Sequence, residues 1–285
     1  MEPGWSGDFV QMRSELAVVA VTARHSVPVR CVQVDNADHL YLAGNGMIPT
    51  HNSTLAMDFM RSCSIVQNQA SVIFSLEMSR SEIAMRLLSA ESKIKLADMR
   101  SGRMTDADWV TLVNCIERVN DAPLHIDDSP NLTMMEIRAK ARRLAQRNDL
   151  RLIVVDYLQL MNSGKKHESR QQEVSDMSRG LKLLAKELGV PVVALSQLNR
   201  GPEQRTDKKP VISDLRESGS IEQDSDVVML LHRPDASDYD SPRGGEADLI
   251  IGKHRNGPTR TLTLCHQLHI SRFGNMARQN QPQWH

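Results

Sequence analysis

The 285-residue chain lacks most of the features that would assign it to a specialised class of protein. Its four cysteines lie far apart and form no CxxC pair, which argues against a structural zinc site or a disulfide framework and favours a reduced, cytoplasmic setting. It has no apolar run of about 18 residues, so no membrane-spanning helix is expected. The 35 basic residues balance the 35 acidic ones, so any surface for a polyanion must be a local patch.

A complete phosphate-binding loop is also missing. Such a loop reads GxxxxGK[ST] and opens a helix, whereas here Ser53 and Thr54 begin a helical pattern directly after His51 and Asn52. Taken alone, the segment reads as a plain N-capped helix. A Gly-Lys pair joined directly before Ser53 would complete the loop.

The tripeptide His51–Asn52–Ser53 carries the groups for a chain-cleavage reaction. An Asn amide can attack its own backbone carbonyl and cut the chain after itself when a neighbouring donor, here His51, polarises that carbonyl. Ser53 can accept the acyl group before the cut. The longer run HLYLAGNGMIPTHN at 39–52 resembles the C-terminal end of an intein, with an irregular β segment as the plainer alternative. The resemblance implies an intein remnant over 1–52, a small β segment that needs an upstream half to splice.

After this junction the pattern changes to alternating strands and helices. Five apolar runs end in polar or charged residues, at 71–77, 152–156, 190–197, 226–233 and 248–255. Apolar stripes at helical spacing lie between them at 133–147 and 172–188. Near-continuous apolar strands indicate burial on both faces, so we expect an α/β sheet with helices on both faces and active groups at the carboxyl ends of the strands.

Polar residues at these strand ends are candidates for nucleotide chemistry. Asp156 follows four apolar residues in the Walker B pattern of a magnesium-site carboxylate, with structural capping as an equal alternative. Glu77 could polarise an attacking water, although a helix cap is the commoner role. Gln197 could contact a γ-phosphate or be a buried polar group. Lys253 and Arg255 share one face of a strand and suit either phosphate charge or a salt-bridged edge.

Five segments together resemble, in order and spacing, the motor domain of the DnaB-type replicative DNA helicase. They are FSLEMS (74–79), IVVDYLQLM (153–161), ALSQLNR (194–200), DLRESGSIEQ (214–223) and KHRNG (253–257). The resemblance covers 53–277, leaves 278–285 as a polar tail, and implies a RecA-like sheet. It also implies ATP and Mg²⁺ as cofactors, single-stranded DNA as partner and a homo-hexamer. Primase contact is not expected, because the family's N-terminal domain is not in this chain.

The resemblance assigns roles to individual residues. Glu77 corresponds to the catalytic base and Gln197 to the γ-phosphate sensor. Ser53 and Asp156 correspond to the magnesium site and, together with Thr54, to the nucleotide-binding residues. A second group would act outside the subunit's own nucleotide site. Lys253 and Arg255 would reach the neighbouring subunit's nucleotide, with Arg255 as the arginine finger, and Arg216, Glu217 and Gly219 would touch the DNA backbone.

Two groups of cations could line the channel of such a ring. Few aromatic residues accompany them, so the expected contacts are to phosphates and sensitive to salt, with solvated loops as the alternative. The cations are Lys165, Lys166 and Arg170 in one loop, and Arg200, Arg205, Lys208, Lys209 and Arg216 in another.

We expect an ATP-dependent helicase motor that is inactive until an upstream Walker A half is joined. Two rival functions remain. One is a catalytically dead oligomerising or DNA-binding fragment, because the lysine that grips the phosphates is missing. The other is a recombination or repair ATPase of the RecA group. The runs DYLQ at 156–159 and RESG at 216–219 disfavour the latter.

Overall fold

The computed structural model describes residues 52–164, 167–199, 201–202, 205–215, 219–236 and 241–276. The predicted intein end lies outside the described residues as far as His51, and its last residue, Asn52, is exposed at the start of the first helix. No helix in the described part of the chain is long and apolar enough to cross a bilayer.

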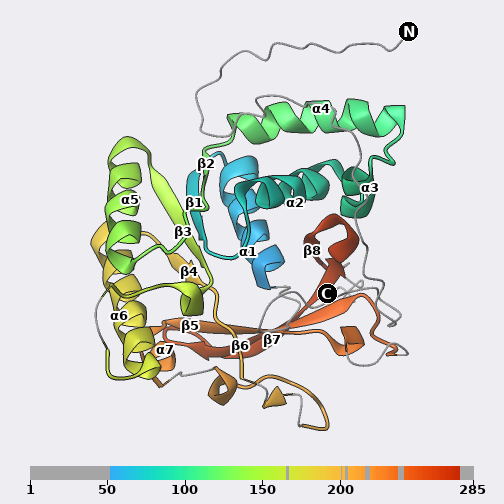
Figure 1. Cartoon of the computed structure of the whole chain (residues 1–285). Coiled ribbons are helices and arrows are strands. Elements are labelled where there is room, and N and C mark those ends of the chain that lie inside the picture. Colours follow the sequence, from blue (N-terminus) through green and yellow to red (C-terminus); the bar gives the residue numbers. More distant parts are fainter. Residues whose placement is uncertain are drawn as a thin grey trace, which may run out of the picture. The chain divides into compact units, whose positions relative to one another are not determined.

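A four-stranded parallel sheet with the order β2-β1-β3-β4 forms the centre of the fold (Figure 1). Its strands are β1 (Ala70–Ser75), β2 (Leu124–Asp127), β3 (Leu150–Asp156) and β4 (Val192–Ala194). The chain leaves β1 toward β2 on one side and leaves β3 toward β4 on the other. The connections after β1 and after β3 therefore run in opposite directions. Open α/β sheets bind ligands at the carboxyl ends of two such strands.

Helices cover both faces of this sheet, as the sequence predicts (Figure 1). On one face, Phe74 and Val155 share a hydrophobic core with Ile137 of α5 and Met177 of α6. On the other, α1 contacts β3. The helices are α1 (Asn52–Met60), continued by a π-helical turn (Arg61–Val66), then α2 (Arg80–Ser92), α3 (Leu96–Ser101), α4 (Asp106–Asp121), α5 (Met134–Arg147), α6 (Arg170–Leu188) and α7 (Gly219–Asp224).

Hydroxyl side chains begin several of these helices. Ser79, Thr105 and Thr133 each accept a hydrogen bond from the backbone N–H three residues later. Thr133 also forms a capping box, because the Glu136 carboxylate accepts from the Thr133 N–H at 2.8 Å. Such caps satisfy N–H groups that have no partner inside the helix.

A second, antiparallel sheet has the order β5-β6-β7-β8. The prediction that all five apolar runs are buried on both faces is wrong for β5, where Val228 and Leu230 are buried but Val227 and Met229 are exposed. This alternation is typical of an antiparallel sheet with one solvated face. The strands are β5 (Val227–His232), β6 (Glu246–His254), β7 (Arg260–Gln267) and β8 (Arg272–Asn275).

A buried network of charges holds α1 and its π-helical turn in place. The Arg61 guanidinium donates to Glu91 on α2, with Nε to Oε1 at 2.8 Å, and pairs with Asp58. The other Asp58 oxygen accepts from the Phe273 N–H on β8 at 2.7 Å. Glu91 also pairs with Arg118 of α4, whose side chain is 54% exposed. The helix that begins at residue 52 is therefore tied to α2 and β8 directly, and to α4 through Glu91.

Candidate active site

The carboxyl ends of β1 and β3 bring Glu77 and Asp156 together. Ser75 and Asp156 are paired in register, and the N–H of Leu76 donates to the Asp156 carbonyl at 2.7 Å. Ser75 Oγ donates to the Met78 carbonyl at 2.7 Å and accepts from the Met78 N–H at 3.1 Å. These bonds fix the turn that carries Glu77 beside the Asp156 carboxylate.

Glu77 is exposed and does not cap the following helix. The N-cap of α2 is Ser79, whose Oγ accepts from the Glu82 N–H at 3.3 Å, so the capping role that competes with catalysis is already filled. The partial burial of the Glu77 carboxyl, and then the charge of Asp156, raise its pKa, and Arg86 opposes the shift. A carboxylate with a raised pKa is a stronger proton acceptor, which suits a general base.

Asp156 and Ser53 form the inner part of the site. Asp156 is 2% exposed, and burial raises its pKa against the opposing effects of the Ser53 hydroxyl and Arg86. Ser53 is 1% exposed, and its Oγ is close enough to the Asp156 carboxylate to lower that pKa, but it makes no hydrogen bond of normal geometry with the described residues. Thr54, also buried, follows it at the start of α1.

The residues present therefore fit a magnesium ion. The buried Ser53 hydroxyl and the Asp156 carboxylate beside it supply the hard oxygen ligands that Mg²⁺ prefers, and phosphate and water oxygens would complete the shell. The N-terminus of α1 also suits a phosphate, because backbone N–H groups at a helix start are free to bind anions. Structural capping is the alternative role of Asp156. Among the described residues, no backbone N–H donates a hydrogen bond to its side chain.

Gln197 lies just beyond β4, in a segment that the Gln159 side chain holds. The Gln197 N–H donates to Gln159 Oε1 at 3.1 Å, and Gln159 Nε2 donates to Ser196 Oγ at 2.9 Å. The Leu158 N–H donates to the Leu195 carbonyl at 2.9 Å, so the amide side chain extends the β3–β4 pairing beyond the strands. Sequence reasoning missed Gln159, although an isolated polar residue three positions after Asp156 in an apolar stretch was a usable signal.

Lys253 and Arg255 bind the segment 222–226 of their own chain. Lys253 Nζ donates to the Glu222 carbonyl at 2.5 Å, near the C-terminus of α7. Arg255, one residue beyond β6, donates from Nη1 to Asp226 Oδ1 at 3.2 Å and from its N–H to the Asp226 carbonyl at 2.8 Å. The structure thus brings them together as a salt-bridged edge, and not with Glu77 and Asp156. Their action on a neighbouring subunit stays a prediction.

Two of the predicted channel cations make internal contacts. Arg170 donates to the Gln159 carbonyl at 2.5 Å, and Arg205 pairs with the buried Asp214. Neither is therefore a simple solvated cation. Lys208 and Lys209 are exposed, and Gly219 opens α7. The remaining predicted DNA contacts lie outside the described residues: Lys165, Lys166, Arg200, Arg216 and Glu217.

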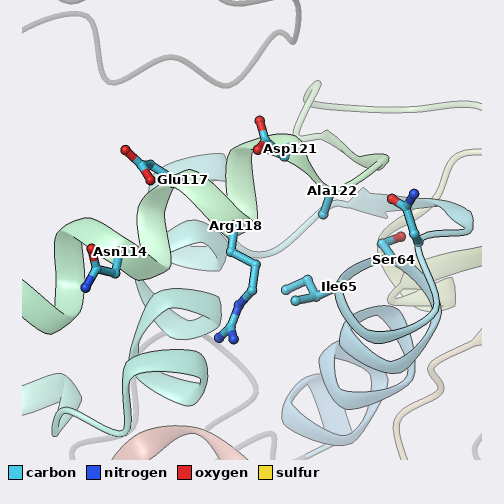
Figure 2. A pocket seen from close by; sticks show the side chains of 8 residues that line it. Ser64, Ile65, Asn114, Glu117, Arg118, Asp121 and Ala122 are labelled. Atoms are coloured by element: carbon cyan, nitrogen blue, oxygen red, sulfur yellow. The ribbon is translucent and has the colours of Figure 1, made fainter.

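A separate hollow of about 400 Å³ lies between α4 and the π-helical turn, where Figure 2 shows Arg118 reaching in beside Ile65. Ser64, in its lining, hydrogen bonds to Ser71 Oγ at 2.6 Å at the start of β1. The hollow is therefore at the amino end of β1. Ligands of such sheets bind at the carboxyl ends, so the hollow is not part of the candidate site.

Comparison with known proteins gives consistent relatives. The chain is 74% identical over 267 residues to the replicative DNA helicase DnaB of Mycobacterium leprae and 73% identical over 261 residues to that of Mycobacterium intracellulare. These alignments cover 94% and 92% of this chain but 44% and 45% of the relatives. The chain thus spans somewhat less than half the length of these relatives.

Solved structures agree with the fold. One structure, described as an ATPase domain, has a TM-score of 0.77 and 34% identity, and the match covers 80% of this chain and 81% of that one. A DnaB-like replicative helicase, solved in a study of its interactions with primase, also has a TM-score of 0.77 and 34% identity, with 80% and 55% covered. The fold is therefore RecA-like, as the sequence resemblance implies.

The family model described as "DnaB-like helicase C terminal domain" matches residues 40–275. The match begins upstream of Ser53, so it includes the last part of the segment that resembles an intein end. It continues through both sheets. This chain belongs to the family of DnaB-like helicase C-terminal domains.

Proposed function

We propose that this chain is the motor domain of a replicative DNA helicase, which couples ATP hydrolysis to movement along single-stranded DNA and to duplex unwinding. The observation that carries the proposal is the juxtaposition of Glu77 and Asp156 at the diverging ends of β1 and β3, with the buried Ser53 hydroxyl beside Asp156. Family membership and the names of the relatives support it.

Each residue of the site has a distinct task in this proposal. Ser53 and Asp156 hold Mg²⁺, which when bound neutralises charge on the phosphates of ATP. Glu77 accepts a proton from the attacking water, and Gln197 contacts the γ-phosphate. Gln159 holds the Gln197 backbone, so it positions the sensor without touching the nucleotide.

The proposal extends to a homo-hexamer on single-stranded DNA. Arg255, assisted by Lys253, stabilises the phosphate charge in the neighbouring subunit, a task for which a guanidinium in trans is suited. To do so Arg255 must exchange its own Asp226 for the nucleotide, which the 68% exposure of its side chain permits. Arg216, Glu217 and Gly219 contact the DNA backbone.

We further propose that His51, Asn52 and Ser53 form a splicing junction. The alignment with the Mycobacterium leprae helicase spans 267 residues, more than the 233 from Ser53 to His285, so it includes much of the segment before Ser53. Coexpression with a fragment ending in an intein N-terminal half should yield a spliced product by mass spectrometry. Asn52→Ala should prevent its formation, and an equal yield from that variant would contradict the junction.

The proposed motor needs a Walker A loop, and Ser53 is preceded here by Asn52 and not by Lys. We therefore expect no DNA-stimulated ATP hydrolysis from the 285-residue chain, and restored turnover when residues 53–285 follow a segment ending in Gly-Lys. Arg255→Ala in that joined chain should abolish turnover. Absence of turnover in the joined chain would favour the dead-fragment alternative, whereas full turnover in the Arg255 variant would refute the trans role.

A further inference from the structure

The loop between Gln197 and Arg216 is closed by one buried carboxylate. The Asp214 side chain is 3% exposed, and the Arg205 guanidinium grips it with two parallel hydrogen bonds, Nη1 to Oδ2 at 2.7 Å and Nη2 to Oδ1 at 2.5 Å. Asp214 Oδ2 also accepts from the Val211 N–H at 2.7 Å. A forked pair of this kind fixes direction as well as distance, because both N–H groups must align at once.

Two further hydrogen bonds join described residues of the same loop. The Asn199 N–H donates to the Asp214 carbonyl at 2.6 Å, and Arg205 Nη1 donates to the Lys209 carbonyl at 2.9 Å. A Cβ on Gly201 would lie 2.8 Å from both Asn199 Oδ1 and Asp214 Oδ1, so a larger residue would displace these two side chains. We call the Arg205–Asp214 pair the loop clamp.

The loop clamp joins two segments with separate tasks. Leu198 and Leu215 form an isolated antiparallel bridge. Leu198 directly follows Gln197, the proposed nucleotide sensor, and Leu215 directly precedes Arg216, the proposed DNA contact. Closing the loop therefore holds Leu215, which precedes the proposed DNA contacts, against Leu198, which follows the proposed sensor.

We propose that Arg205 and Asp214 are positioning residues that hold Leu215 against Leu198, so that the proposed contacts Arg216, Glu217 and Gly219 meet the phosphate backbone of single-stranded DNA. This rests on the proposed function. Arg205 is then no DNA contact itself, in contrast to its place among the predicted channel cations. The direct cations of this loop are Lys208 and Lys209, which are exposed and have no ion-pair partner among the described residues.

Oligonucleotide binding distinguishes positioning from direct contact. Fluorescence anisotropy of a labelled oligo-dT with the 285-residue chain should show Arg205→Lys losing roughly fivefold or more in affinity, as Arg205→Ala does, because an ammonium cannot form the fork. The slope of log K against log salt should stay unchanged in Arg205→Lys and fall by about one in Lys208→Ala. Wild-type affinity in Arg205→Lys, with affinity and slope reduced in Arg205→Ala, would overturn the proposal.

Hydrogen exchange tests the loop clamp without DNA. The amide protons of Asn199 and Val211 should lose protection in Asp214→Ala. They should keep it in the control Asp207→Ala, which removes an exposed carboxylate from the same loop. Unchanged protection in Asp214→Ala would refute the loop clamp. A different outcome would refute the proposed function and not the loop clamp. In that outcome Asp214→Ala loses protection as expected, but neither the unmodified chain nor the joined chain binds oligo-dT.

Discussion

Arg61 offers the clearest test of what holds the helix that carries Ser53. Its side chain is 10% exposed and bridges Asp58 and Glu91, whose side chains are 14% and 8% exposed. Arg61→Met keeps most of the side-chain volume but leaves both carboxylates without this partner in a poorly solvated place. Breaking a buried pair from one side costs about 3–5 kcal/mol. That is a large part of the roughly 5–15 kcal/mol by which a typical domain is stable.

Urea unfolding followed by far-UV circular dichroism measures this cost. With a slope of about 2 kcal/mol per molar urea, the midpoint for Arg61→Met should fall by roughly 1.5–2.5 M. Arg118→Met is the matched control, because Arg118 pairs with the same Glu91 from a side chain that is 54% exposed. An exposed pair contributes about 1 kcal/mol or less. Equal shifts in the two variants would refute the assignment of the buried network as the anchor of α1.

Three further predictions concern single contacts. Thr133→Ala removes the N-cap of α5 and should lower the free energy of unfolding by about 1 kcal/mol, measured by urea unfolding, with no change in ATP turnover of the joined chain. Asp226→Ala removes the partner of both Arg255 and Lys182, and each pair has a side chain that is more than half exposed, so stability should change by about 1 kcal/mol or less for each pair, and a larger loss would show that this cluster is structural. Gln159→Ala should lower turnover with little change in nucleotide affinity, because Gln197 loses its backbone anchor; a loss of affinity alone would contradict this role.

The loop clamp also predicts a dependence on pH. The Arg205 guanidinium chiefly, with the Val211 N–H, holds the pKa of Asp214 below its ordinary value of 3.8, against the effect of burial. A depressed carboxyl pKa stabilises the fold above the ordinary value, and this contribution is lost as the pH falls through the lower, folded value. Protection of the Val211 amide proton should therefore persist at pH 5 and decline only in more acidic buffer, below about pH 4. In Asp214→Ala protection should be absent at both pH values.

Much of the central sheet could be predicted from local pattern. The apolar runs ending at Glu77 and Asp156 correspond to β1 and β3, and the stripe containing Val174 and Met177 lies buried on α6 as predicted. Such patterns succeed because a strand buried on both faces and a helix buried on one leave different spacings. The run Val227–His232 fails this rule, since a continuous apolar sequence does not reveal that alternate side chains face solvent.

Contacts between distant residues were not predictable in the same way. The N-cap of α2 is Ser79 and not Glu77. The two residues are only two positions apart, and the spacing of apolar residues does not fix the start of a helix that closely. The Arg205–Asp214 pair joins a loop without periodicity, and charge composition could only mark Arg205 as a candidate DNA contact. The strand β2 has only four residues, in which buried apolar and partly buried polar side chains alternate. It was too short to be predicted from its sequence pattern.

The most direct test of the nucleotide site is DNA-stimulated ATP hydrolysis by residues 53–285 joined to a Walker A segment, compared with its Glu77→Gln variant. The matched control is Glu82→Gln, which removes a carboxylate from the nearby α2 that pairs with Arg86 and Arg100. Loss of the general base should reduce turnover by at least about a hundredfold while nucleotide binding persists, and the control should retain turnover. Turnover in Glu77→Gln equal to that of the control would contradict the proposed site.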